Sequence, residues 1–174
     1  SSGTTKAVGA NNQQVVIGLN KADVDHIKGD PALAVAKDST YIFFPVAFVQ
    51  DGSENEAVAT TQQVTTYQKD NVGPVLQAFD LNMDSAQITM TFNEVVKASS
   101  VVAAEARLQS AADGSGVSSD ALDGAVVGGD STVVVVQLTL ASANTIRDLS
   151  TLGVSDVTSY LVLSTSFAKD VDEN

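Results

Sequence analysis

The sequence predicts an all-β protein made of antiparallel β-sandwich repeats, with one short crossover helix in each repeat. Val is the most frequent residue, and Thr and Ser are also common, which favours strands over long helices. Short apolar segments alternate with clusters of Asn, Asp, Gly and Ser, as expected for short antiparallel strands joined by turns. One segment of 44 residues also occurs twice, which indicates a tandem repeat. About seven short strands in a repeat of this size are typical of a β-sandwich.

The repeat aligns residues 12–55 with residues 131–174 at an offset of 119 residues, without a gap. Twelve of the 44 pairs are identical, and the shared apolar positions follow one pattern. The identical pairs are Val15/Val134, Val16/Val135, Leu19/Leu138, Ala22/Ala141, Ile27/Ile146, Leu33/Leu152, Val35/Val154, Tyr41/Tyr160, Phe48/Phe167, Asp51/Asp170, Glu54/Glu173 and Asn55/Asn174. We therefore expect one fold for both segments. The pairs expected in equivalent buried places are Leu19/Leu138, Ile27/Ile146, Tyr41/Tyr160 and Phe48/Phe167.

This repeat divides the chain into three parts. Residues 1–69 are predicted to be the C-terminal part of one sandwich repeat, including its closing strand. Residues 70–73 are a linker, and residues 74–174 are a second repeat that lacks a closing strand. The two repeats are thus expected to be incomplete in complementary ways.

In the first repeat, "KADVDHIKG" (residues 21–29) predicts a short helix with Asn20 as its N-cap. The residues expected to face the sheets are Ala22, Val24 and Ile27. Residues 57–68, "AVATTQQVTTYQ", alternate in a largely polar pattern, which predicts the closing edge strand.

In the second repeat, residues 86–92 ("AQITMTF") alternate between apolar and polar side chains. This predicts a half-buried strand with Ile88, Met90 and Phe92 on one face. Residues 141–149 ("ASANTIRDL") are the counterpart of the first helix, and residues 111–124 are a loop by composition. The other strands are predicted at residues 75–81, 104–109, 131–138 and 159–167.

The composition argues against several kinds of partner. A net charge of −12 disfavours a nucleic-acid partner. No apolar run approaches the ~20 residues of a membrane-spanning helix, so membrane insertion is not expected. The absence of Cys excludes disulfides, thiolate metal sites and Cys nucleophiles.

The sequence predicts no enzyme activity. The single His, His26, is placed on the polar side of the first helix, and its counterpart in the other repeat is Thr145. No Gly-x-Ser-x-Gly, His-Glu-x-x-His or phosphate-binding loop occurs in the chain.

Calcium is the candidate cofactor, because the turns and the linker are rich in Asp, Asn and Glu, whose oxygens are the ligands it prefers. "D-x-N-x-D" at Asp80, Asn82 and Asp84 can direct oxygens at one centre, although full EF-hand spacing is absent. The other candidate ligands lie in the linker and at the ends of the two repeats: Asp70, Asn71, Asp51, Glu54, Asp170, Asp172 and Glu173. The competing interpretation is that these residues form turns and solvated acidic surface.

Two segments resemble known repeats. "PVLQAFDLNMDSAQITMTFNEVVKASSV" (residues 74–101) resembles the opening of the immunoglobulin-like or cadherin-like repeats of large extracellular proteins of microbes and algae. "LNKADVDHIKGDPALAVAKDSTYIFF" (residues 19–44) resembles a later part of the same repeats. The Asp…Glu-Asn endings resemble their Asp-x-x-Gly-Asn close, with Glu where the family has Gly. The resemblance implies immunoglobulin-like sandwiches, an extracellular or cell-surface location, and adhesive or spacer roles without catalysis.

The sequence thus favours a structural or adhesive protein whose subunits join head to tail into a fibre or surface layer. The strand at residues 57–68, represented by Ala57, Val58, Val64 and Tyr67, or the polar N-terminal segment, would complete the sheet of a neighbouring copy.

Two alternatives remain. One is a calcium-stiffened module of a larger secreted protein that binds carbohydrate, such as surface glycans, or another ligand. The absence of Trp and the expected burial of Tyr41 and Tyr160 disfavour it. The other is an intracellular, self-assembling shell.

Overall fold

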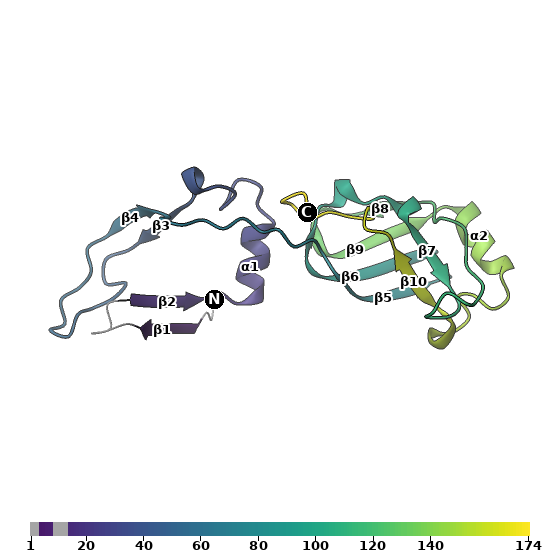
Figure 1. The fold of residues 1–174 in the computed structure, drawn as a ribbon, viewed down its shortest axis with the longest axis horizontal. Helices are drawn as coiled ribbons and strands as arrows, with labels where there is room; N and C mark the ends of the chain where they lie inside the picture. The colour runs from purple at the N-terminus through teal and green to yellow at the C-terminus, as the bar shows by residue number, and fades with distance from the viewer. Residues whose placement is uncertain (1–3, 9–13) are drawn as a thin grey trace. The chain divides into compact units, whose positions relative to one another are not determined.

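The computed structural model describes residues 4–8 and 14–174. The described chain consists mainly of β-strands in antiparallel sheets, with two α-helices (Figure 1). It forms two compact units, Ser1–Asn71 and Val72–Asn174, and the boundary lies within residues 70–73. No helix among the described residues has the length and apolar character needed to cross a membrane.

The first unit contains two separate two-stranded sheets and one helix. β1 (Thr4–Val8) pairs with β2 (Gln14–Gly18), α1 covers Lys21–Lys28, and β3 (Tyr41–Phe44) pairs with β4 (Thr60–Gln63). β4 lies inside the predicted closing strand at residues 57–68. The polar N-terminal segment forms β1 in part, and its residues 1–3 and 9–13 lie outside the described chain.

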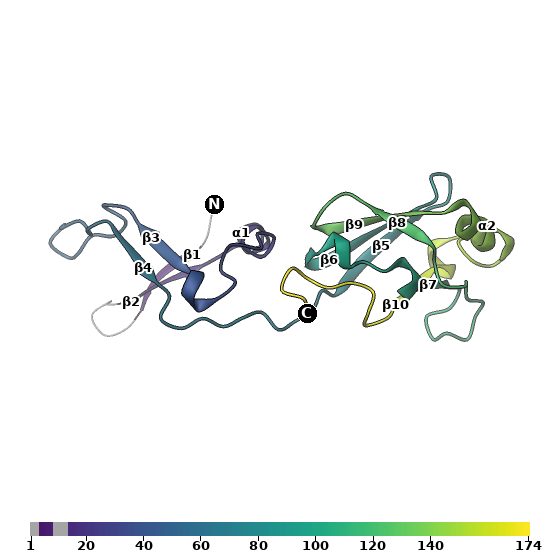
Figure 2. The ribbon, with the colours of Figure 1, turned by 90° about the horizontal axis from the view of Figure 1, so that it is seen from above.

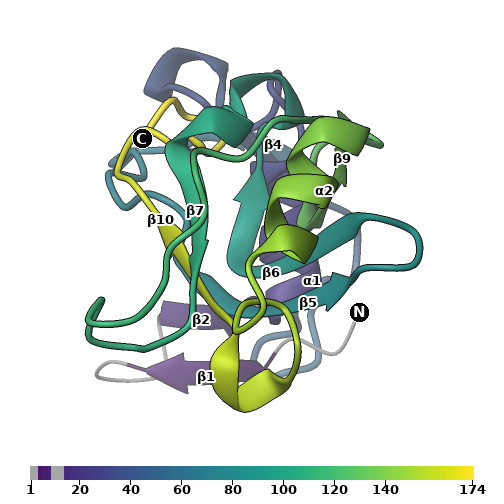
Figure 3. The same ribbon diagram turned by 90° about the vertical axis from the view of Figure 1, so that its right-hand side faces the viewer.

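The second unit contains a four-stranded sheet in the order β5-β6-β9-β8 and a two-stranded sheet of β7 and β10. Their bounds are β5 Leu76–Asn82, β6 Gln87–Val96, β7 Ala106–Gln109, β8 Gly124–Val127, β9 Ser131–Leu138 and β10 Tyr160–Leu163. Helix α2 (Leu140–Asp148) connects β9 of the first sheet with β10 of the second (Figure 2). β7 and β10 lie side by side in Figure 3.

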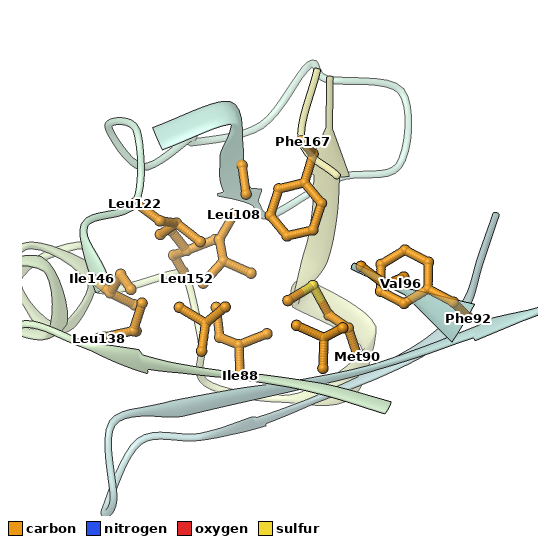
Figure 4. Close-up of a cluster of buried hydrophobic side chains, with 13 residues drawn as sticks. Ile88, Met90, Phe92, Val96, Leu108, Leu122, Leu138, Ile146, Leu152 and Phe167 are labelled. Atoms are coloured by element: carbon orange, nitrogen blue, oxygen red, sulfur yellow. The ribbon is translucent and has the colours of Figure 1, made fainter. Parts of the chain in front are cut away.

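The core of the second unit collects side chains from both sheets and from α2. The alternation predicted for β6 is confirmed, because Ile88, Met90 and Phe92 are all buried on one face. Figure 4 shows these side chains pointing toward Leu108 of β7 and toward Phe167. Burial of this apolar face is the main force that holds the two sheets together.

Two strand predictions needed revision. β8 was not expected, because it begins with Gly124, which closes the segment assigned to a loop, and is followed at once by Gly128 and Gly129. β10 ends at Leu163 rather than at Phe167, since Ser164 begins a turn in which the Phe167 N–H donates to the Ser164 carbonyl oxygen at 3.1 Å.

The two copies of the repeat make the same local hydrogen bonds at positions 119 residues apart. The Asp23 N–H donates to Oδ1 of Asn20 at 2.9 Å, which caps α1 as predicted. In α2, Thr139 caps the helix in the same way, accepting from the Ser142 N–H at 3.3 Å. The 3-10 turns Lys37–Ser39 and Asp156–Thr158 then precede β3 and β10. The repeated sequence thus encodes the same local structure twice.

The expectation of equivalent burial is wrong. Leu138 is 4% exposed and Phe167 2%, whereas Leu19 is 54% and Phe48 is 41% exposed. Tyr41, expected in the core, is 56% exposed, and α1 has no buried residue. The reason is physical: within this chain the first unit has no counterpart of residues 74–119, which supply β5, β6 and β7 to the second core.

Candidate metal site

The Asp-x-x-Glu-Asn endings of the two copies form the same turn. The backbone N–H of Asn174 donates to Oδ1 of Asp170 at 2.9 Å, and its side-chain amide donates to Oδ2 at 3.1 Å. Asn55 donates to Asp51 in the same way, at 2.9 and 2.8 Å. An Asp side chain that accepts hydrogen bonds from residues ahead of it stabilises a turn. The Asp and Asn shared by the two copies therefore form a turn in each of them.

The Glu that precedes the last Asn of each turn stands at a strained backbone position. Glu54 and Glu173 have φ angles of 64° and 71°, in the left-handed region that Gly adopts most easily. The Asp51–Asn55 hydrogen bonds sit beside this residue in the first copy. Donation from the Asn55 side chain, followed by the Asn55 and Ser53 backbone N–H groups, lowers the pKa of Asp51.

In the second unit, this turn brings Asp170 beside a buried carboxylate on β6. Val96 forms an isolated β-bridge with Asp170, which fixes the turn against the end of β6. Glu94 and Asp170 are each only 4% exposed. Buried carboxylates are uncommon unless they are paired, hydrogen-bonded or bound to a metal.

Glu94 was not among the predicted ligands, although its sequence carries a signal. It continues the period-two series of Ile88, Met90 and Phe92 on the inward face of β6. An acidic residue at the next inward position of an apolar strand is unusual. That position marks Glu94 as a candidate ligand.

Glu94 and Asp170 form a pair of buried carboxylates in the second unit that could hold a metal ion. One carboxylate oxygen of Glu94 lies within 4.8 Å of one of Asp170. Like charges at this distance repel, and a bound cation would offset the repulsion. Carboxylates suit hard, oxygen-preferring cations such as Ca²⁺ and Mg²⁺.

The rim of this turn also carries a cation. The Lys97 ammonium forms an ion pair with Glu173, and the hydrogen bond from Lys97 to Glu173 raises the pKa of the lysine. Lys169 lies 3.8 Å from the same carboxylate. Glu173, a predicted ligand, is thus engaged by two ammonium groups.

The other predicted ligands are used differently. Oδ1 of Asn82 accepts hydrogen bonds from the Asp84 and Ser85 N–H groups, both at 3.0 Å, so the Asp80–Asp84 stretch forms a turn between β5 and β6. The Asn71 amide donates to the Lys69 carbonyl oxygen at 3.1 Å, and Asp70 forms an ion pair with Lys28.

Comparison with protein-family models, with curated proteins and with solved structures found no match to this chain.

Proposed function

We propose that this protein is a non-catalytic structural or adhesive protein of the cell exterior, built from tandem immunoglobulin-like β-sandwiches. The observation that carries the proposal is the repeat. A helix cap, a 3-10 turn and an Asp turn recur at an offset of 119 residues with the same local hydrogen bonds, and a strand follows the 3-10 turn in both copies. Tandem copies of one fold are typical of fibres, stalks and surface layers.

The sandwich assignment rests on the arrangement of the second unit. Its four-stranded and two-stranded sheets are both antiparallel and share one apolar core. Helix α2 carries the chain from one sheet to the other. Two antiparallel sheets around a common core are the basic plan of immunoglobulin-like and cadherin-like domains.

The proposal includes head-to-tail assembly by strand complementation, and the test is the mass of the chain in solution. We expect the full chain to form species larger than the monomer at micromolar concentration, with an average mass that rises with concentration, because each unit lacks strands that the other possesses. Sedimentation velocity at several concentrations measures this. A well-folded species that stays monomeric throughout the series would contradict the assembly.

The bound cation is proposed to be calcium, held by Glu94 and Asp170 of the second unit. A ligand at about 100 times its Kd stabilises the folded state by about 2.7 kcal/mol. We therefore expect added calcium to raise the melting temperature by several degrees, and Glu94→Gln to abolish most of that rise. The measurement is a thermal melt at increasing calcium concentration.

Asp51→Asn is the matched control for this titration. Asp51 occupies the same turn as Asp170, and the group of carboxylates around Glu94 does not include it. Asp51→Asn should keep the full calcium response. No change in the wild-type melting temperature up to millimolar calcium would disprove the site.

A second candidate function, carbohydrate binding, gains support from β3. Tyr41 and Phe43 are two residues apart on this strand, and both are more than half exposed. Neighbouring exposed aromatic rings are a common platform for sugars, since their faces are apolar. Glycan-array binding that is lost in Tyr41→Ala would favour this function over a purely structural one.

A further inference from the structure

The edge of β3 that β4 occupies is identified by hydrogen bonding. In an antiparallel pair, residues that exchange hydrogen bonds alternate with residues that do not, so successive backbone groups point to opposite edges. The Val64 N–H donates to the carbonyl oxygen of Thr40, its opposite residue, at 3.0 Å. By this alternation Ile42 and Phe44 also face β4.

β10, the counterpart of β3, is paired along its other edge. The Ser164 N–H donates to the carbonyl oxygen of Glu105 at 2.9 Å, in the same register that pairs Tyr160 with Gln109. Tyr160 and Val162 therefore face β7. Leu161 and Leu163, the counterparts of Ile42 and Phe44, point their backbone groups away from it.

The outer edge of β10 is open among the described residues. β7 pairs with the inner edge of β10, and the other edge of β7 is itself paired with the segment around Ser119 and Leu122. No strand pairing is found for β10 other than with β7 in the part of the chain that the structure describes. An open edge of this kind is a template for another strand.

Two grooves run beside this open edge. One, of about 390 Å³, is lined by Leu161 and Leu163 of β10 and by Leu76 and Phe92 of the four-stranded sheet. The second, of about 350 Å³, lies further along β5 and has a mixed lining that includes Phe79, Leu81 and Asp156. A strand added to β10 would direct every second side chain into these grooves.

Charge restricts what can occupy the edge. The chain carries a net charge of −12, yet the first groove is lined entirely by uncharged residues. Residues 57–68 are equally free of Asp, Glu, Lys and Arg. This segment, called the donor segment below, can therefore approach the edge without burying a charge or meeting a like one.

We propose that the open edge of β10 binds the donor segment of a second copy of this chain, in the register that β4 has on β3. Leu161 would then lie opposite Gln62, and Leu163 opposite Thr60, since Ile42 and Phe44 have these partners within the chain. The inference rests on the head-to-tail assembly proposed above and identifies its acceptor strand and its register.

The exchange is driven by burial. β4 leaves β3 and gains the same hydrogen bonds on β10, so the number of strand hydrogen bonds changes little. In the first unit, however, β4 is largely exposed and Val58 is 83% exposed. On β10, the face that carries Val58, Thr60, Gln62 and Val64 lies over the grooves. A head-to-tail contact of this kind extends into an open filament unless it closes a ring.

A peptide experiment tests the acceptor edge. A fluorescent peptide with the sequence of residues 57–68 is titrated with the full chain and followed by anisotropy. Gln62→Pro removes an N–H that faces β10, whereas Thr61→Pro removes one that faces away. We expect the Gln62→Pro peptide to bind at least about tenfold more weakly than the Thr61→Pro peptide. Equal binding of the two, or no binding up to about 1 mM peptide, would overturn the proposal.

Matched variants of the acceptor provide a second readout. Leu161→Lys places an ammonium group at the groove, while Val162→Lys places one on the outer face of the same strand. We expect Leu161→Lys to weaken peptide binding at least about tenfold and Val162→Lys to leave it within about twofold. Circular dichroism confirms that each variant is folded.

Crosslinking in the assembled state tests the register. The chain contains no Cys, so single variants can be mixed. Thr61 and Val162 would be opposed without exchanging hydrogen bonds, with Cα atoms about 4.5 Å apart, which permits a disulfide. A mixture of Thr61→Cys and Val162→Cys should give disulfide-linked dimers, and a mixture of Gln62→Cys and Val162→Cys far fewer.

These experiments separate the inference from the proposed function. Self-association without the Thr61–Val162 crosslink would retain the assembly and overturn the acceptor edge. Peptide binding with the expected proline pattern in a chain that stays monomeric would support the acceptor edge and overturn the assembly.

Discussion

Phe167→Ala is expected to lower the free energy of unfolding of the second unit by about 3–5 kcal/mol. The ring is 2% exposed and lies among the core side chains of both sheets, stacked on Phe92 with centroids 6.4 Å apart. Its removal leaves a cavity that the surrounding strands cannot fill completely. The loss of buried apolar surface and the loss of packing contacts therefore both lower the free energy of unfolding. Urea unfolding followed by hydrogen-exchange mass spectrometry locates the loss in residues 72–174.

The repeat offers a matched control at Phe48. This residue has the same place in the repeated sequence, but it is 41% exposed, and its ring centroid lies 4.8 Å from that of Phe44. Phe48→Ala should cost about 1 kcal/mol or less. Equal losses for the two variants would mean that the two copies are packed alike, contrary to the burial described above.

Ile146→Ala has the second largest expected effect, about 2–4 kcal/mol. Ile146 is 1% exposed and, with Ala143, forms the buried side of α2. Because α2 joins the two sheets, loss of this side chain loosens the helix from the core as well as leaving a cavity. Chemical denaturation of the full chain, read by circular dichroism, measures the change.

Ile27→Ala is the corresponding control on α1. Ile27 aligns with Ile146, yet α1 has no buried residue, so the expected loss is about 1 kcal/mol. A loss at Ile27 as large as that at Ile146 would refute the assignment of Ile146 to a core that the first unit lacks.

The sequence by itself determined the local structure of the repeat. The Asn20 cap, the alternation of β6 and the two helices depend on residues within a few positions of one another, and each was predicted from these neighbours. The Asp51–Asn55 and Asp170–Asn174 turns have the same basis, since one side chain and one nearby backbone N–H are sufficient to form them.

Burial was decided only by the tertiary structure. Identical residues such as Tyr41 and Tyr160, or Phe48 and Phe167, differ in exposure because β5, β6 and β7 cover one copy and not the other. Local sequence contains no information on whether distant strands are present.

The metal group and the open edge were decided in the same way. Glu94 and Asp170 are 76 positions apart in the sequence and meet because the bridge between Val96 and Asp170 closes the turn onto β6. The edge of β10 that stays open depends on which residues exchange hydrogen bonds with β7. Both features arise from the register of long-range strand pairs, which the alternation of a single strand leaves undetermined.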